Sequence, residues 1–253
     1  MKKVNNHNKT YNSLSKREAA LLNAVEAHLV FSLTALRRLT GWKTTTISNV
    51  LTSLKQKGAI VPVKKNAYVL ASKIPEHSLR IATILTHPSY ISFWTAGSYY
   101  GFTEQQAQPI QVVSTKQHRP LKIGIHKIEI MTVKPAKWFG YTKINNIPIA
   151  EPEKLLIECL YKPEKTGGID EIKKILKNAW PKINQAALRR YVEQYHVKAL
   201  FARLGFLLED LHLRNDLEKL LMRRLPKGYT RLNPAKKAVA AYNKKWRVII
   251  NDQ

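Results

Sequence analysis

The sequence contains no long hydrophobic run, since none of its apolar stretches approaches the roughly 18 residues of a membrane span. Its first residues are rich in lysine and asparagine, and the apolar core of a signal peptide is missing from them. Both absences argue against a membrane or exported protein. We therefore expect a protein of the cytoplasm with no membrane partner.

Residues that carry catalysis or bind metals are scarce or scattered. The single cysteine, Cys159, stands in an apolar run and is more typical of a small buried side chain than of a reactive thiol. No aspartate precedes Asp170, and no two of the 8 histidines stand four residues apart. Metal-assisted phosphoryl chemistry and a zinc site therefore lack ligands. We expect no cofactor, no bound metal and no catalytic residue.

Acidic residues are few compared with basic ones, because 17 Asp and Glu stand against 43 Lys and Arg, which gives a net charge of +26. A surplus of this size indicates a polyanionic partner. Residues 1–75 have 13 basic and 2 acidic residues, residues 76–170 have 11 and 8, and residues 171–253 have 19 and 7. The charge therefore gathers at both ends of the chain. We expect the basic C-terminal third to act as a second clamp on a nucleic-acid backbone.

The stretch from Ser32 to Leu70 has the pattern of a helix-turn-helix followed by a wing. Ser32 can cap a short helix with Leu33, Leu36 and Leu39 on its apolar face, and Gly41 can end that helix with a positive φ. A second helix is indicated by apolar residues at i, i+3, i+4 and i+7, namely Ile47, Val50, Leu51 and Leu54. Gly58 closes it.

A further helix and a hairpin complete this pattern. Ser15 and Glu18 form a capping-box motif, and the helix that starts there has an apolar face of Leu21, Leu22, Val25 and Leu29. The runs 59–63 and 67–70 predict two strands joined by a basic turn at 64–66. We therefore predict an α+β protein with a flexible basic arm at 1–13, a winged helix-turn-helix at 14–73, and a domain boundary near 72–75.

The second helix of this motif has a polar face suited to a DNA groove. We expect base contacts from Thr45, Thr46, Asn49 and Ser53. We expect phosphate contacts from Arg37, Arg38, Lys43, Thr44, Lys64 and Lys65. Asparagine suits adenine, a threonine methyl suits thymine, and no arginine is present to read guanine, so double-stranded operator DNA with A/T-rich inverted repeats is the expected partner. The alternative is a packed helical pair with a solvated polar face.

Residues 76–151 indicate a mixed α/β segment. A helix is expected at 90–100, closed by Gly101, followed by strands at 110–114, 121–125 and 128–133. Asn145 and Asn146 are typical of a two-residue hairpin turn, because asparagine tolerates a positive φ. The aromatic residues of this segment either form a core or stack on single-stranded bases, and the core is favoured: Tyr90, Phe93, Trp94, Tyr99, Tyr100 and Phe102.

Residues 152–253 are expected to be mainly helical. Apolar residues at three-and-four spacing predict helices at 153–161, 169–178, 184–195, 197–210 and 216–225, with strands near 229–232 and 246–250. A Glu-x-Lys pattern at Glu171–Lys173 is also found in nucleases, but it falls on one of these helices. We interpret it as a helix surface.

Four short motifs stand out in the C-terminal two thirds of the chain. The first is the stretch 90–105, which carries Tyr90, Ser92, Trp94, Tyr100, Gly101, Glu104 and Gln105. The next are 138–141 and 150–156, the latter with Glu151, Pro152, Glu153 and Lys154. The last is 203–209, with Arg203 and Gly205. In this order the motifs resemble those of AbiEi-type antitoxins, which are transcriptional regulators of abortive-infection toxin–antitoxin systems.

This resemblance implies a transcriptional autorepressor and antitoxin. Its winged helix would bind operator DNA, and residues 76–253 would supply antitoxicity against an AbiEii-like nucleotidyltransferase toxin. In the type IV description of the family, antitoxin and toxin form no stable complex, and direct contact remains open here. The alternatives are an RNA- or ribosome-binding basic module and, with less support, a metal-dependent nucleic-acid enzyme. The basic C-terminal third and the arginine-free recognition helix depart from the family pattern.

Overall fold

The computed structural model describes residues 14–105, 109–237 and 240–251. The arm expected at 1–13 lies outside the described residues. The chain divides into two compact units. The N-terminal unit contains the residues up to His87 together with His118–Glu129, and the C-terminal unit contains Pro88–Gln117 and the residues from Ile130 onward. Helices and β-sheets occur in both units, so the predicted α+β class is confirmed at this level.

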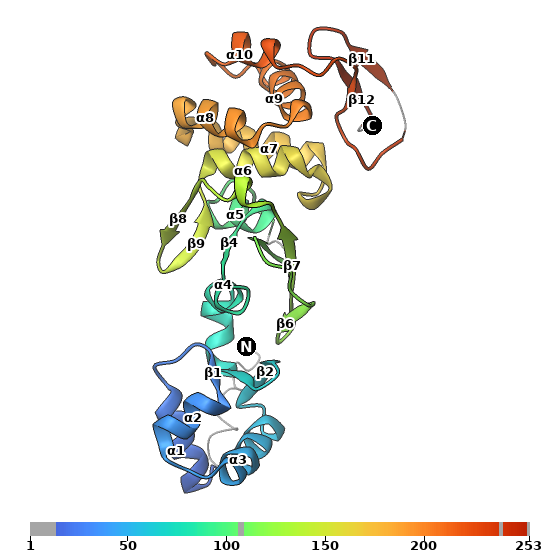
Figure 1. The fold of residues 1–253 in the computed structure, drawn as a ribbon. Coiled ribbons are helices and arrows are strands. Elements are labelled where there is room, and N and C mark those ends of the chain that lie inside the picture. Colours follow the sequence, from blue (N-terminus) through green and yellow to red (C-terminus); the bar gives the residue numbers. More distant parts are fainter. Residues whose placement is uncertain (1–13, 106–108, 238–239, 252–253) are drawn as a thin grey trace, which may run out of the picture. The chain divides into compact units, whose positions relative to one another are not determined.

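The N-terminal unit is built from short helices and a small sheet. Its elements are α1 (Lys16–Val25), β1 (Phe31–Ser32), α2 (Leu33–Thr40), α3 (Thr44–Gln56), β2 (Ile60–Lys64), β3 (Ala67–Leu70), α4 (Ile74–Leu85), β6 (Leu121–Ile123) and the first half of β7 (His126–Thr132) (Figure 1). The strand order in the sheet is β1–β3–β2, and both pairings are antiparallel. Strand β6 pairs with β7 as a hairpin.

Local sequence signals fix where these helices begin and end. The capping box is present, because Ser15 Oγ accepts from the Glu18 amide and the Glu18 carboxylate accepts from the Ser15 amide. Ser32 caps α2 through the Ala35 amide at 3.1 Å. Gly41 ends α2 with φ +69°, a conformation that side chains with a Cβ rarely adopt. These three predictions are confirmed.

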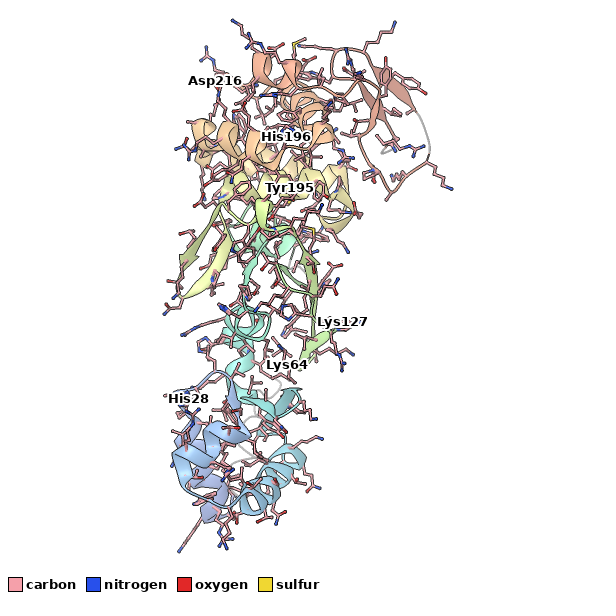
Figure 2. The ribbon with its side chains drawn as sticks, viewed as in Figure 1. His28, Lys64, Lys127, Tyr195, His196 and Asp216 are labelled. Carbon is pink, nitrogen blue, oxygen red and sulfur yellow. The ribbon has the colours of Figure 1, made fainter. Side chains whose placement is uncertain are left out.

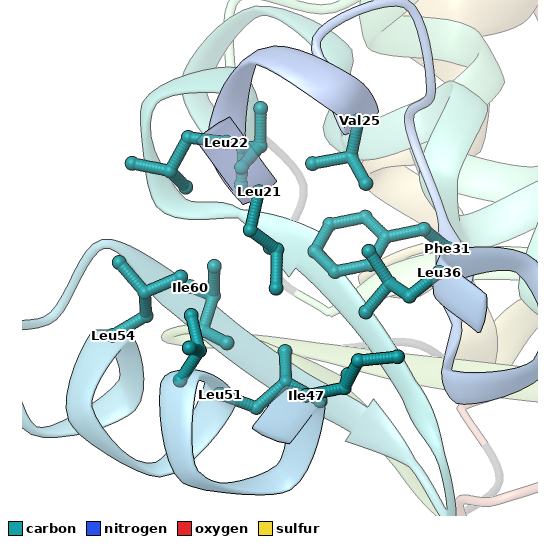
Figure 3. Close-up of a cluster of buried hydrophobic side chains, with 11 residues drawn as sticks. Leu21, Leu22, Val25, Phe31, Leu36, Ile47, Leu51, Leu54 and Ile60 are labelled. Atoms are coloured by element: carbon teal, nitrogen blue, oxygen red, sulfur yellow. The ribbon is translucent and has the colours of Figure 1, made fainter. Parts of the chain in front are cut away.

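Helices α1, α2 and α3 share one hydrophobic core (Figure 3). Its buried members are Leu21, Leu22, Val25, Phe31, Leu36, Ile47, Val50, Leu51, Leu54, Ile60 and Leu70. Two residues that were expected on the apolar faces of these helices do not belong to the core. Leu39 is 47% exposed, because α2 buries only Leu36 among its residues, and Leu29 lies beyond α1, which ends at Val25. The unit also continues past the boundary predicted at 72–75, since α4 follows β3 after one short 3₁₀ turn and belongs to it.

The C-terminal unit combines a larger sheet, a group of helices and a second small sheet. Its elements are β4 (Ser89–Ile91), α5 (Phe93–Tyr99), β5 (Ile110–Ser114), the second half of β7, β8 (Tyr141–Ile144), β9 (Ile147–Ala150), α6 (Pro152–Tyr161), α7 (Ile169–Ala179), α8 (Gln185–Tyr195), α9 (Lys198–Asp210), α10 (Glu218–Arg223), β10 (Thr230–Arg231), β11 (Ala241–Asn243) and β12 (Val248–Ile250) (Figure 1). The part of the larger sheet that lies in this unit has the order β7–β5–β4–β9–β8. The small sheet has the order β10–β12–β11.

Most helices of this unit lie where the spacing of apolar residues predicts them. The strands are predicted less well. The Asn145–Asn146 turn is confirmed, since both residues have positive φ between β8 and β9. The helix predicted at 90–100 is wrong at its start, because Tyr90 and Ile91 pair with Val113 and Val112 in the sheet and the helix begins only at Phe93. Strand β11 was not predicted.

Candidate functional site

Helix α3 of the N-terminal unit presents one buried and one exposed face. The residues that face away from the core are exposed and polar: Thr45, Asn49, Thr52 and Gln56. They repeat at the spacing of helical turns, so they form one continuous line along the helix. The sequence singled out Thr45 and Asn49 of this line but missed Thr52 and Gln56. A helical-wheel projection centred on the buried residues would have found them, because they lie opposite the apolar positions.

Ser53 serves the interior of the unit. Its hydroxyl donates to Glu18 Oε1 at 2.6 Å, while Lys57 Nζ lies 2.8 Å from Glu18 Oε2. Glu18 is only 3% exposed, so this cluster ties α1 to α3 beneath the surface. A hydroxyl engaged in this way is unsuited to reading a base edge. We therefore leave Ser53 out of the DNA contacts proposed below.

The Glu18 cluster makes the N-terminal unit sensitive to acid. Lys57, and then Ser53 and Ser15, lower the pKa of Glu18 from 4.5 to about 2. A carboxyl whose pKa is lowered by folding stabilises the fold above its unfolded pKa and loses that contribution as the pH falls. The contribution of Glu18 is therefore complete above pH 4.5 and disappears as the pH falls toward about 2.

We expect Glu18→Gln to lower the opening free energy of the α1 and α3 amides by about 1–3 kcal/mol at pH 7, because a buried charged hydrogen-bond partner is lost. Hydrogen exchange followed by mass spectrometry measures this. The matched control is Glu26→Gln, since Glu26 pairs with Lys73 at the surface, where ion pairs contribute little. Equal effects of the two substitutions at pH 7 would contradict the prediction.

Most of the expected phosphate-binding residues are exposed. Arg37 and Arg38 lie in the last turn of α2, and Lys43 and Thr44 stand at the start of α3. The three cations form no ion pair with another residue of the part of the chain that the structure describes. They are available to a polyanion.

The basic end of the β2–β3 hairpin is less available to a polyanion than the sequence predicts. Lys64, labelled in Figure 2, donates from Nζ to the Leu85 carbonyl at the end of α4. Strand β2 also packs beside β6 within the same unit. Lys65, the next residue in the turn, is exposed and forms no ion pair with a described residue. Of these two lysines, Lys65 is therefore the better placed to meet a phosphate.

The motif residues of the C-terminal unit form a buried polar cluster. Glu158 on α6 is fully buried, and its carboxylate accepts from Tyr90 Oη at 2.7 Å and from Ser92 Oγ at 2.5 Å. Lys154, one turn earlier, lies 3.6 Å from the same carboxylate and donates to the Lys137 carbonyl at 2.8 Å. Glu158 was not among the predicted site residues, although its position four residues after Lys154 was a signal for an ion pair.

Aromatic rings enclose this cluster. Lys154 Nζ stands 3.8 Å from the ring centre of Phe139 and 4.5 Å from that of Tyr195, which is labelled in Figure 2. Tyr90 stacks on Tyr141 with 4.9 Å between ring centres. Burial lowers the pKa of Lys154 to about 8 and raises the pKa of Glu158. Because both charged groups are closed off from solvent, the cluster organises the unit and offers no surface for a substrate.

Other motif residues hold loops and helix ends together. Glu151 accepts from Tyr191 Oη at 2.5 Å, and Glu153 accepts from the Asn184 amide at 2.6 Å, so both tie the start of α6 to α8. Pro152 occupies the first position of α6, where its missing N–H costs nothing. Tyr100 donates to the Ala150 carbonyl at 2.8 Å. These residues hold the framework of the unit in place.

Two motif residues of α9 connect it to the end of the chain. Arg203 donates to the Leu160 carbonyl at 2.7 Å and to the Arg231 carbonyl at 3.1 Å. Gly205 lies directly under the Trp246 ring, and Trp246 Nε1 donates to Glu209 Oε2 at 2.8 Å. The small sheet is thereby fixed to α9.

The remaining residues of the motif at 90–105 are partly packed in the unit and partly exposed. Trp94 packs over Gly167, and its amide donates to Gln111 Oε1 at 3.0 Å. Glu104 and Gln105 are exposed after the turn at Gly101. Tyr90, Phe93 and Phe102 are at most 2% exposed, so the core interpretation of these three aromatic residues is confirmed. Cys159 is buried too, and burial raises the pKa of its thiol to about 12.

The described residues contain neither a candidate metal site nor a candidate membrane span. No group of three or more His, Cys, Asp or Glu in the described ranges could hold a metal ion. No described helix has the length and apolar character needed to cross a membrane.

Comparisons with known proteins agree with the resemblance drawn from the motifs. Residues 90–210 match the family model of the AbiEi antitoxin C-terminal domain, and this match confirms the resemblance to AbiEi-type antitoxins. The crystal structure of the RV2827C protein from Mycobacterium tuberculosis is similar over 94% of this chain and 92% of that chain, with a TM-score of 0.69 and 14% identity. At this identity the likeness concerns the fold alone. A comparison with curated proteins found no match.

Proposed function

We propose that the chain is the antitoxin of a toxin–antitoxin system and that it also represses its own transcription by binding operator DNA. The match of residues 90–210 to the AbiEi antitoxin C-terminal domain supports the antitoxin role. The matched family is one of antitoxins and not of enzymes. The proposal assigns DNA binding to residues 14–73 as a winged helix-turn-helix and antitoxicity to the C-terminal unit.

The observation that carries the DNA-binding proposal is the exposed polar line on α3 in a strongly basic surrounding. Helix α2 and helix α3 meet across the short turn at Gly41, and the β2–β3 hairpin follows α3. This order of elements is that of a winged helix. Short polar side chains along an exposed helix face suit base edges, and the cations at its start suit the flanking phosphates. We therefore propose α3 as the recognition helix.

The base contacts proposed are Thr45, Asn49, Gln56 and the methyl group of Thr52, with Thr46 on the flank of the line. The Thr52 hydroxyl itself donates to the Ser48 carbonyl at 2.9 Å. We expect Asn49→Ala to weaken operator binding by about 1–3 kcal/mol and to leave binding to random DNA unchanged, because an amide pair with adenine is lost while phosphate contacts persist. Fluorescence anisotropy with operator and random duplexes at one salt concentration measures both. Equal losses on the two duplexes would show that Asn49 reads no base.

The phosphate contacts proposed are Arg37, Arg38, Lys43, Thr44 and Lys65. We expect Lys65→Ala to lower affinity on every duplex and to reduce the slope of log affinity against log salt by about one, since one phosphate contact releases about one counterion. Lys73→Ala is the matched control, because the Lys73 ammonium is paired with Glu26. If Lys73→Ala changes the slope as much as Lys65→Ala does, Lys65 makes no phosphate contact of its own.

The toxin proposed as the genetic partner is an AbiEii-like nucleotidyltransferase. The buried motif cluster cannot touch it, because Lys154 and Glu158 are both 0% exposed. Any direct contact would have to use exposed parts of the C-terminal unit, such as Glu104 and Gln105. The proposal does not require a stable complex.

One pair of assays on the full-length protein tests both parts of the proposal. We expect the wild-type chain to restore growth of cells that express the toxin and to silence a reporter placed behind its own promoter. Asn49→Ala should release the reporter and still restore growth, because α3 belongs to the N-terminal unit. A variant that loses both functions while remaining folded and abundant would refute the division of labour.

A further inference from the structure

We propose that the small sheet of the C-terminal unit, β10–β12–β11, is a binding platform for single-stranded nucleic acid, with Tyr229 and Tyr242 stacking on bases. This function is separate from operator binding, since the platform lies in the C-terminal unit and α3 in the N-terminal unit. Strands β11 and β12 are labelled in Figure 1.

The two faces of this sheet differ in character. Val248 of β12 is fully buried, and its neighbours across the sheet are Thr230 and Asn243. The next residue of β12, Ile249, therefore points to the other face, where its cross-strand neighbours are Arg231 and Tyr242. Arg231 and Tyr242 are both exposed. The outward face thus carries a cation, an apolar residue and an aromatic ring in one row.

Tyr229 extends this face. It directly precedes β10, and its ring packs against the ring of Tyr242 on the outward face. The rings of Tyr229 and Tyr242 lie 5.2 Å apart with an interplanar angle of 82°. An edge-to-face pair leaves at least one face of each ring uncovered by the other. The residues are 46% and 57% exposed, which is unusual for aromatic side chains of this size.

The charge around the platform is strongly positive. Residues 219–251 contain 10 Lys and Arg and no Asp or Glu. The nearby carboxylates Glu209 and Glu218 both pair with Lys245, at 2.5 and 2.9 Å. Exposed cations stand beside both tyrosines in the chain, namely Lys227, Arg231 and Lys244. A polyanion therefore meets a positive field at this sheet.

Exposed aromatic rings on a sheet with flanking cations suit unpaired bases. Each base offers a π-face to a ring while the cations follow the backbone, and the interaction is tolerant of sequence. A duplex hides its base faces inside the stack, so it could use the cations but not the tyrosines. This difference separates the proposal from a clamp on double-stranded DNA.

The experiment uses the full-length protein and three labelled probes at fixed salt: an oligouridine RNA, an oligothymidine DNA of equal length, and a random duplex. We expect the double variant Tyr229→Ala, Tyr242→Ala to bind both single strands about tenfold more weakly or worse, because each stacked base contributes about a factor of five or more. Duplex binding should change by less than about twofold. The matched control is Tyr229→Phe, Tyr242→Phe, which keeps the rings and should bind single strands as the wild type does.

Other outcomes are decisive as well. Stronger binding to the RNA than to the DNA strand would identify RNA as the ligand through its 2′-hydroxyl groups, and equal binding would identify single strands of either kind. Unchanged affinity of the alanine variant for single strands would overturn the proposal. Equal loss on the duplex would also overturn it and make the surface a duplex clamp. Asn49→Ala separates this result from the proposed repressor function, since it should leave single-strand binding intact.

Discussion

Replacing Gly205 by alanine is expected to loosen the small C-terminal sheet from α9. A methyl group at this position would lie within 2.7 Å of three carbon atoms of the Trp246 ring, so the ring has to move. Moving it breaks the hydrogen bond from Trp246 Nε1 to Glu209 and disturbs the packing of β12 on α9. Overpacking of this kind costs about 1–3 kcal/mol and can cost more where the neighbour is a large ring. Hydrogen exchange of the β10–β12 amides measures the loss.

A second substitution reverses the sign of this effect. A Trp246→Ala background removes the three atoms nearest to the added methyl group, and Gly205→Ala should then stabilise α9 by up to about 1 kcal/mol through helix propensity. Trp246→Ala alone should cost about 3–5 kcal/mol, because a large buried ring is removed. Gly228→Ala is the control, since nothing lies within 4 Å of an added methyl group there. Additive effects at residues 205 and 246 would refute the steric explanation.

Lys154→Met is expected to destabilise the C-terminal unit by about 3–5 kcal/mol, because it leaves the Glu158 carboxylate buried without its counter-ion. The substitution keeps the length of the side chain and removes its charge. It also removes the donor to the Lys137 carbonyl. The loss of stability is measured by hydrogen exchange of the α6 amides at increasing denaturant concentration. This readout reports on the C-terminal unit separately from the N-terminal unit.

The pairing of Lys154 with Glu158 is tested by a double-mutant cycle. Glu158→Gln should cost less in the Lys154→Met background than in the wild type, because a neutral amide needs no counter-ion and can still accept from Tyr90. The matched control is Lys162→Met, because Lys162 pairs with Glu164 near the surface and should contribute below about 1 kcal/mol. Independent costs of Lys154→Met and Glu158→Gln would mean that the two side chains do not interact.

The Lys154 prediction also has a pH dependence. Burial lowers the pKa of Lys154 from 10.5 to about 8, so folding favours its neutral form. A lysine with a lowered pKa binds fewer protons in the folded state than in the unfolded state between those two values. The contribution of Lys154 to the stability of the C-terminal unit should therefore rise as the pH increases from about 8 to 10.5. Lys154→Met should remove this rise.

Local rules were sufficient for the features that depend on residues a few positions apart. The Ser15–Glu18 capping box, the turn at Asn145–Asn146 and the glycine that ends α2 each involve at most four consecutive positions, and the sequence predicts all three. Helical periodicity is of the same kind, because a buried face repeats every three or four residues. The family resemblance was also readable, since its motifs are short and contiguous.

Only the tertiary structure decided which polar residues are available at the surface. Ser53 is a residue type suited to a base contact, but its hydroxyl donates to Glu18, 35 residues earlier. Lys64 is a residue type suited to a phosphate contact, but its ammonium donates to the Leu85 carbonyl. Tyr90 and Ile91 were predicted as helix because they precede one, yet their partners in β5 make them strand. In each case the deciding partner lies more than 20 residues away, where sequence spacing carries no information.

The same dependence on distant residues explains two features of the C-terminal unit, namely its buried ion pair and its exposed tyrosine pair. Glu158 is an ordinary helix residue in the sequence, and it becomes a buried anion only because Tyr90 and Ser92 are folded onto it from more than 60 residues away. Tyr229 and Tyr242 become one platform because β10 and β11 both pair with β12. The sequence by itself determined most of the helices, the caps at Ser15, Ser32 and Gly41, and the charge, because these depend on neighbours along the chain. The fold decided which of those charges and rings meet, because that depends on neighbours in space.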